Sequence, residues 1–192
     1  RDPEQGFAVL FFDLDRFKNV NDSLGHLHGD QLLRKIAERV EKACRPGDTV
    51  ARFGGDEFVI LVEDIKDIRG ATVAAERIQE EFRTPFDLEG NEVFATISIG
   101  IALWNPEYNR AEDLLRDSDT AMYRATAMGR NSFTVFDEQM HRQVVSTLRL
   151  ENDLRRALAR NEFRVFYQPI VSIDDGHIAG FEALVRWQHP ER

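Results

Sequence analysis

Two short acidic segments of this sequence could carry out chemistry. The first ends at Asp13, after an apolar run, and the second is Asp56–Glu57, directly after Gly54–Gly55. Grouped carboxylates stay ionised at a cost in free energy unless a cation lies between them. Two acids with a backbone carbonyl form a hard oxygen site that suits Mg²⁺, as in metal-assisted phosphoryl transfer. A solvated acid pair on a polar turn stays open as the alternative, because Gly-Gly-Asp turns are common.

The strands that carry these acids must be neighbours for the acids to meet. Residues 7–13 are apolar on both faces, which is typical of a buried central strand. Residues 49–53 and 57–63 are predicted to form two strands of a hairpin, since glycines at its tip supply the positive φ that a tight turn needs. If the first strand lies beside 57–63, Asp13 and Asp56 converge at one edge of a sheet.

The remaining elements alternate between helices and strands. The sequence predicts helices from about 16 to 25, over 30–43, about 70–83 and 111–127, and strands over 92–103 and 132–136. This order, with a hairpin in the middle, suits an α+β fold. We expect a largely antiparallel central sheet flanked by helices, close to a ferredoxin-like or polymerase-palm (nucleotidyl-cyclase) layout.

The composition restricts the kind of protein. The 192 residues include 34 acidic and 25 basic side chains, which argues against broad binding to nucleic acid but not against a pocket for one nucleotide. Cys44 is the single cysteine, so no intrachain disulfide is possible and a reducing, cytoplasmic compartment is expected. No apolar run approaches the roughly 20 residues that span a bilayer, so we expect no membrane segment in this chain.

After about residue 137 the pattern changes. Leu150, Leu154 and Leu158 repeat at a spacing of four among charged residues, which indicates an amphipathic helix. Two strand-like runs follow, over 163–170 and 178–187. We therefore predict one mixed domain over 1–137, a linker helix over 138–160, and the truncated beginning of a second domain over 161–192.

Seven short segments together resemble one known family. Gly54–Phe58 is similar to the signature of the GGDEF family of diguanylate cyclases. Further blocks match that family in order and spacing: Phe12–Lys18, then Asn21-Asp22, Gly25-His26 and Gly29-Asp30, then Thr96–Gly100, and Gly129–Asn131. The resemblance covers about residues 7–136 and is highly specific.

The resemblance implies a reaction and its partners. Two GTP molecules would condense to cyclic di-GMP and two pyrophosphates, by metal-assisted attack of each 3′-hydroxyl on the other α-phosphate. Because one site holds one GTP, this chemistry needs a two-fold homodimer when active. The expected metal is Mg²⁺ or Mn²⁺, and the product would act as a feedback inhibitor.

The resemblance also implies a role for each matching residue. The metal ligands would be Asp13, the Leu14 carbonyl and Asp56, with Glu57 assisting the metals or the attacking hydroxyl and Lys18 stabilising the transition state. Substrate would be bound by the guanine readers Asn21 and Asp30, by Phe17 near the phosphate loop, and by Gly54, Gly55 and Arg130. A carboxylate accepts from the N–H edge of guanine, whereas adenine would leave it unpaired.

Each role has a plainer alternative. Lys18 lies on a predicted helix face, where solvated charges are ordinary. Asn21 could cap the turn that follows it, and Asp30 could cap its own helix.

A pair upstream of the glycine turn resembles the inhibitory site of the family. Arg45 and Asp48 have the RxxD spacing and the expected offset before Gly54. An arginine can bind phosphate or guanine through two parallel hydrogen bonds, and an aspartate can accept from guanine. A helix C-terminal arginine followed by a Pro-Gly turn is the alternative.

One position departs from the family pattern. Thr126 stands where a lysine usually precedes Gly-Arg-Asn, so one phosphate contact is missing. A lost contact to developing phosphate charge costs on the order of tenfold in rate.

The end of the chain resembles a second family. Leu150–Leu154, Tyr167–Ile170 and Glu182–Trp187 are similar to the start of an EAL domain, the cyclic di-GMP phosphodiesterase family. Glu182 matches a metal-binding glutamate, and Gln168 and Arg186 match substrate-side positions. The alternative to a cyclase is therefore a non-catalytic GTP-binding domain that controls an attached EAL phosphodiesterase, which Thr126 and the tandem order favour.

Overall fold

A computed structural model of the chain describes residues 6–188, but not the side chains at 139 and 141–149. The chain divides into two compact units, 1–141 and 142–192. In order, the elements are β1 (Gly6–Leu14), α1 (Phe17–Leu24), α2 (His26–Ala43), β2 (Thr49–Gly54), β3 (Glu57–Ile65), α3 (Ile68–Glu81), β4 (Phe86–Leu88), β5 (Asn91–Val93), β6 (Ile97–Leu103), α4 (Ala111–Ala127), β7 (Phe133–Val135), α5 (Glu138–Ala159), β8 (Phe163–Val171) and β9 (Ile178–Trp187).

The first unit has a five-stranded sheet with the strand order β2-β3-β1-β6-β7. All neighbouring pairs are antiparallel except β6 and β7, which run parallel. The central position of β1 explains its composition, because its residues from Ala8 to Phe12 are buried and a middle strand is covered on both faces. The predicted α+β class, the central strand and the largely antiparallel sheet are confirmed.

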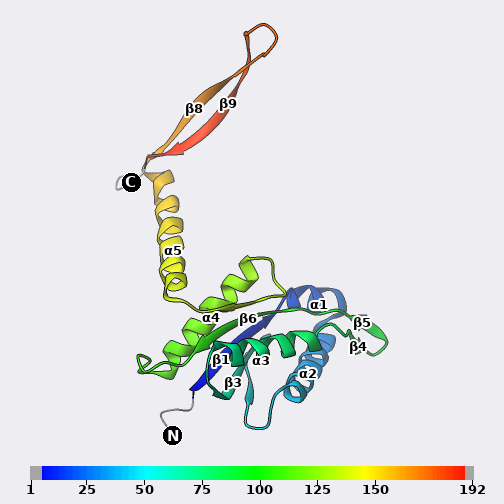
Figure 1. Cartoon of the computed structure of the whole chain (residues 1–192). Helices are drawn as coiled ribbons and strands as arrows, with labels where there is room; N and C mark the ends of the chain where they lie inside the picture. The colour runs from blue at the N-terminus through cyan, green and yellow to red at the C-terminus, as the bar shows by residue number, and fades with distance from the viewer. Residues whose placement is uncertain (1–5, 189–192) are drawn as a thin grey trace. The chain divides into compact units, whose positions relative to one another are not determined.

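Helices cover both faces of this sheet (Figure 1). On one face, Phe12 of β1 stacks on Phe58 of β3 with ring centroids 5.1 Å apart, and its edge meets Phe82 at the end of α3. On the other face α4 lies so close to β6 that a Cβ on Gly100 would be 1.9 Å from the Ser118 carbonyl oxygen. The core therefore fixes the strand ends from two sides.

Two predicted boundaries were wrong. Helix α2 begins at His26 rather than at 30, because the φ of +85° at Gly25 reverses the chain within one residue. The predicted strand over 92–103 is two strands, β5 and β6, and the sequence analysis missed β4. A turn with positive φ at Glu89 and Gly90 folds β5 back onto β4 as a separate two-stranded sheet.

The second unit contains most of α5 and the hairpin of β8 and β9. Gln168 and Glu182 are directly opposite each other in this hairpin, and Arg186 lies four residues further along β9. All three side chains are exposed. Among the described helices, none combines the length and the apolar character that crossing a membrane requires.

Candidate active site

The two acidic segments meet at one end of the sheet. Strand β1 pairs with β3 so that Asp13 is opposite Glu57, and it pairs with β6 so that Asp13 is opposite Ser98. Directly paired residues project from the same face of a sheet, here the face that α4 covers. Asp56 is in the turn between β2 and β3, one residue before Glu57. The predicted neighbourhood of the first strand and 57–63 is therefore confirmed.

The carboxylate of Asp13 is poorly compensated by protein groups. Its Oδ1 atom is buried and has no hydrogen-bond partner. Burial, followed by the charge and the hydrogen-bonding contact of Asp56 and by the charge of Glu57, raises the pKa of Asp13 to about 7. Burial also raises the pKa of Glu57, with Asp119 of α4 and then Asp56 adding to the shift. Asp56, Glu57 and Asp119 thus add negative charge around the Asp13 carboxylate.

A divalent cation fits this donor set. A buried carboxylate oxygen without a partner, beside a second carboxylate, is the environment that a cation stabilises. Leu14 follows Asp13 in the same strand, so its carbonyl is a further oxygen near by. Within residues 6–188, no group of three or more His, Cys, Asp or Glu side chains is arranged to hold a metal ion. An ion here would take the rest of its shell from water or phosphate, as Mg²⁺ does.

The chain turns sharply between β1 and α1. Arg16 has a φ of +59°, in the left-handed region, and no side chain caps the first turn of α1. Helix N-termini with free N–H groups bind phosphate. Phe17 is half-buried against the core, and Lys18 is exposed on α1. The start of α1 is thus open to an anion close to Asp13.

The hairpin tip is also open. Gly55 has a φ of +50°, and its carbonyl accepts a hydrogen bond of 2.8 Å from Nε of Arg52. A Cβ on Gly54 or Gly55 would meet no atom within 4 Å. A ligand can therefore approach this backbone closely.

The two predicted guanine readers come from different helices. Asn21 of α1 reaches α2, where its Oδ1 atom would lie 1.9 Å from a Cβ on Gly29. Asp30 is the next residue of α2 and is exposed. The Oδ1 atom of Asn21 is buried without a hydrogen-bond partner. Gly29 is needed for this approach, so Asn21 lies against the turn of α2 that carries Asp30.

Arg130 lies in a turn after α4, beside the start of β6. Gly129, Arg130 and Asn131 have φ values of +131°, +67° and +47°. The backbone N–H of Asn131 donates to Asp15, two residues beyond Asp13. Arg130 therefore belongs to the same end of the sheet, whereas the hydroxyl of Thr126 donates back to the Met122 carbonyl within α4.

The predicted inhibitory pair lies apart from this end, at the link between α2 and β2. The carboxylate of Asp48 accepts a hydrogen bond of 2.8 Å from the backbone N–H of Arg45. Nη2 of Arg77, from α3, lies 3.7 Å from the same oxygen, and its Nε and Nη2 atoms are buried without hydrogen-bond partners. Arg77 was not predicted from the sequence, because only the packing of α3 brings it to Asp48.

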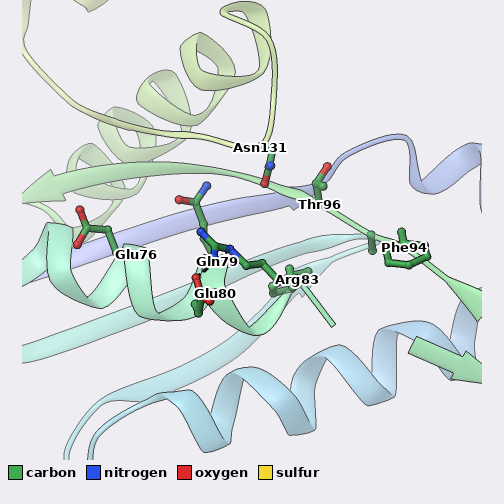
Figure 2. A pocket seen from close by; sticks show the side chains of 9 residues that line it. Glu76, Gln79, Glu80, Arg83, Phe94, Thr96 and Asn131 are labelled. Atoms are coloured by element: carbon green, nitrogen blue, oxygen red, sulfur yellow. Dashed lines mark ion pairs between the residues drawn. The ribbon is translucent and has the colours of Figure 1, made fainter. Parts of the chain in front are cut away.

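A cavity of about 540 Å³ lies behind the turn that carries Arg130. Figure 2 shows Glu76, Gln79 and Glu80 projecting from α3 and Arg83 following its end, opposite Thr96 and Asn131. Glu80 and Arg83 form an ion pair of 2.9 Å. The sequence analysis did not predict this cavity, since its walls come from three separate segments.

A second acid cluster lies at the opposite end of the sheet. Asp117 of α4 is 5% exposed. Its carboxylate accepts a hydrogen bond of 2.8 Å from the Tyr108 hydroxyl and one of 3.0 Å from Nη2 of Arg116. Burial and then this hydrogen bond raise the pKa of Tyr108 far above its usual range. Asp117 is fully compensated by protein groups, which is the pattern of a structural acid.

Comparison with known proteins identifies the family. The description "Diguanylate cyclase, GGDEF domain" matches residues 1–132, and "EAL domain" matches residues 151–192. The chain therefore belongs to the GGDEF family and continues into the start of an EAL domain. GGDEF domains generally depend on a metal ion.

Two curated relatives match almost the whole chain. The bifunctional diguanylate cyclase/cyclic di-GMP phosphodiesterase MucR of Pseudomonas aeruginosa is 43% identical over 98% of this chain and 27% of the relative. The cyclic di-GMP phosphodiesterase NbdA of the same species is 39% identical over 97% of this chain and 24% of the relative. The chain thus spans about a quarter of the length of these relatives.

Solved structures agree with the fold of the first unit. The GGDEF domain of YfiN (TpbB) from Pseudomonas aeruginosa is 39% identical, with a TM-score of 0.68 over 71% of this chain and 85% of that one. The GGDEF domain of DgcB from Caulobacter crescentus, solved in complex with c-di-GMP, is 26% identical, with a TM-score of 0.64 over 68% of this chain and 78% of that one.

Proposed function

We propose that the first unit is a diguanylate cyclase domain, which condenses two GTP molecules to cyclic di-GMP and two pyrophosphates. The observation that carries this proposal is the buried, unpartnered oxygen of Asp13 beside Asp56, at the ends of β1 and β3. Membership of the GGDEF family supports the same chemistry.

The reaction consists of two equivalent substitutions at phosphorus. In each, the 3′-oxygen of one GTP forms a bond to the α-phosphorus of the other, and the bond from that phosphorus to the pyrophosphate oxygen breaks. The 3′-hydroxyl loses its proton. Glu57 is our candidate acceptor, because burial and the neighbouring acids raise its pKa and so make its carboxylate a better base.

Asp13, the Leu14 carbonyl and Asp56 are the residues that would hold Mg²⁺ or Mn²⁺. When bound, such an ion neutralises phosphate charge and favours the ionised 3′-hydroxyl. Asp13 and Leu14 end β1 and Asp56 lies in the turn before β3, so the two acids and the carbonyl would reach an ion from one end of the sheet.

The other site residues would orient GTP. Asn21 of α1, which lies against Gly29, and Asp30, the next residue of α2, would accept from and donate to the guanine edge. The uncapped start of α1, next to Phe17, would hold phosphate oxygens through backbone N–H groups. The exposed cations Lys18 and Arg130 would offset the charge that develops on phosphate.

Two copies of the chain are needed for one product molecule. One site of this kind binds one GTP, so the two 3′-hydroxyls reach the two α-phosphates only when two sites face each other across a two-fold axis. We therefore expect a homodimer in the active state.

Product would inhibit through a separate site. Arg45 and Asp48 have the spacing of the inhibitory motif of the family, and Arg77 brings a guanidinium beside Asp48. Two arginines and one carboxylate suit a ligand with both phosphates and guanine edges.

The second candidate function is a GTP-binding domain that does not turn over and controls an EAL phosphodiesterase. It is favoured by Thr126, whose hydroxyl is bonded within α4 and replaces a phosphate-contacting lysine. The name of NbdA, a phosphodiesterase that matches almost the whole chain, is consistent with this reading.

One experiment separates the two functions. The chain is incubated at high protein concentration with GTP and Mg²⁺, and the products are resolved by chromatography. The cyclase function predicts cyclic di-GMP and pyrophosphate, with no product from the Asp13→Asn variant. Tight GTP binding without product would reject the cyclase in favour of the regulatory domain.

A further inference from the structure

Asp15 joins three segments that lie far apart in the sequence. Its Oδ2 atom accepts a hydrogen bond of 2.7 Å from the hydroxyl of Thr96 and one of 3.1 Å from the backbone N–H of Asn131. Its Oδ1 atom accepts a hydrogen bond of 2.7 Å from the hydroxyl of Ser98. Its own N–H donates to the Thr96 carbonyl at 2.9 Å. One carboxylate thus connects the end of β1, the start of β6 and the turn after α4.

The turn held by Asp15 has a costly backbone conformation. Arg130 and Asn131 both have φ values in the left-handed region, +67° and +47°. A residue with a Cβ is strained in this region, so surrounding contacts must select it. The N–H of Arg130 donates to the Ala125 carbonyl at 3.2 Å, and Ser132 accepts from the N–H of Ile99 at 3.0 Å. Asn131 lies between these two bonds, and its own backbone N–H is held by the carboxylate of Asp15.

The direction of the Arg130 side chain depends on this turn. The φ and ψ angles of Arg130 and Asn131 set where the Cα–Cβ bond of Arg130 points, and a released turn would relax toward conformations without the strain. Figure 2 shows Asn131 and Thr96 close together at the rim of the cavity, with α3 on the other side. The turn borders this cavity, and the hydrogen bond from the Asn131 N–H to Asp15 ties it to the end of β1.

We propose that Asp15 is a positioning residue, whose carboxylate fixes the turn 129–131 and thereby places Arg130 for the phosphates of bound GTP. The proposal rests on the proposed function, because GTP is the ligand that Arg130 would contact. A carboxylate suits this role better than an amide, since all three bonded groups donate and a charged acceptor binds them more strongly. Asn at this position would turn an NH₂ group toward at least one donor.

Two measurements on the full chain test the proposal with Asp15→Asn. The first is hydrogen exchange of the Asn131 amide, followed by NMR, which we expect to accelerate at least about tenfold because its acceptor is weakened. The second is GTP affinity in a double-mutant cycle with Arg130→Ala. We expect Asp15→Asn to weaken GTP binding about tenfold in the chain with Arg130, and less than about twofold in the Arg130→Ala variant.

Asp67→Asn is the matched control, since it makes the same change of charge at the N-cap of α3. It should change neither the exchange of Asn131 nor GTP affinity. If Asp15→Asn does not fold, Thr96→Val replaces it, because it removes one donor to the Oδ2 atom of Asp15. It should weaken GTP binding about threefold, and the loss should again be smaller when Arg130 is absent.

Unchanged exchange at Asn131, or an equal loss of GTP affinity in both backgrounds, would overturn the positioning role. A chain that bound no GTP in any variant, yet showed accelerated exchange at Asn131 in Asp15→Asn, would instead overturn the proposed function. In that case Asp15 would still be shown to hold the turn.

Discussion

Two carboxylates with buried oxygens lie at opposite ends of the same sheet, and their surroundings differ. Asp117 accepts from the Tyr108 hydroxyl and from the guanidinium of Arg116, so its charge is balanced by protein groups. Asp13 has a buried oxygen without a partner and faces the acids Asp56 and Glu57. An uncompensated acid costs folding free energy, so its presence indicates a ligand that supplies the missing charge.

The largest effect is expected from Asp13→Asn. Loss of this carboxylate should lower cyclic di-GMP formation at least about a hundredfold, because it removes a ligand of the cation that balances phosphate charge. The free energy of unfolding, from urea titration of the metal-free protein, should stay equal or rise, since repulsion with Asp56 is relieved. Asp67→Asn should leave both quantities unchanged. A large loss of stability in Asp13→Asn would remove the contrast with Asp117.

Asp117→Ala should have the opposite pattern. We expect the free energy of unfolding to fall by about 2 kcal/mol, because the half-buried Tyr108 hydroxyl and the Arg116 guanidinium lose their acceptor. GTP affinity, measured by calorimetry on the folded variant, should be unchanged. Asp113→Ala, which breaks only the more exposed ion pair with Arg116, should cost about 0.5 kcal/mol. A specific loss of GTP binding in Asp117→Ala would show that both ends of the sheet serve the site.

Thr126→Lys would add a further cation at the Asp13 end, close to the turn that carries Arg130, as Arg116 already serves Asp117. If the position has the role that the family pattern implies, turnover of GTP should rise about tenfold. Steady-state release of pyrophosphate measures this. Ala127→Lys places the same charge at the adjacent exposed position and should raise turnover much less.

The smallest effect is the pH dependence of stability. The pKa of Asp13 is about 7 in the folded protein and near 3.8 when unfolded, so the folded state binds more protons between these values. The free energy of unfolding of the metal-free protein should therefore fall as pH rises from about 4 to about 7. We expect this contribution to be about 1 kcal/mol, because solvent screens a half-buried carboxylate.

The same urea titrations serve as the control for the pH effect. The fall in stability should be absent in Asp13→Asn and should be smaller when Mg²⁺ is added, because the cation favours the ionised form. A pH profile identical in Asp13→Asn and the natural chain would assign the dependence to other groups.

Much of the site could be predicted from the sequence because its signals are local. The apolar run before Asp13 predicted a central strand, and the glycines before Asp56 predicted the hairpin that brings this acid back to it. The start of α2 at His26 and the split of 92–103 were not predicted, because single positive-φ turns at Gly25 and Gly90 decide them. Such turns leave no periodic pattern in the flanking residues.

By itself, the sequence determined the order of elements, the family motifs and the set of acids that could bind a cation. Tertiary structure decided which acids have their charge balanced by protein groups. Asp13 ends a predicted strand and Asp117 lies in a predicted helix, yet only Asp117 has Tyr108 and Arg116 beside it. It also decided that Arg77 joins Asp48 and that Asp15 holds Asn131. Charge balance and hydrogen bonding depend on distances of a few ångströms between residues far apart in the chain, and packing of the sheet and its helices sets these distances.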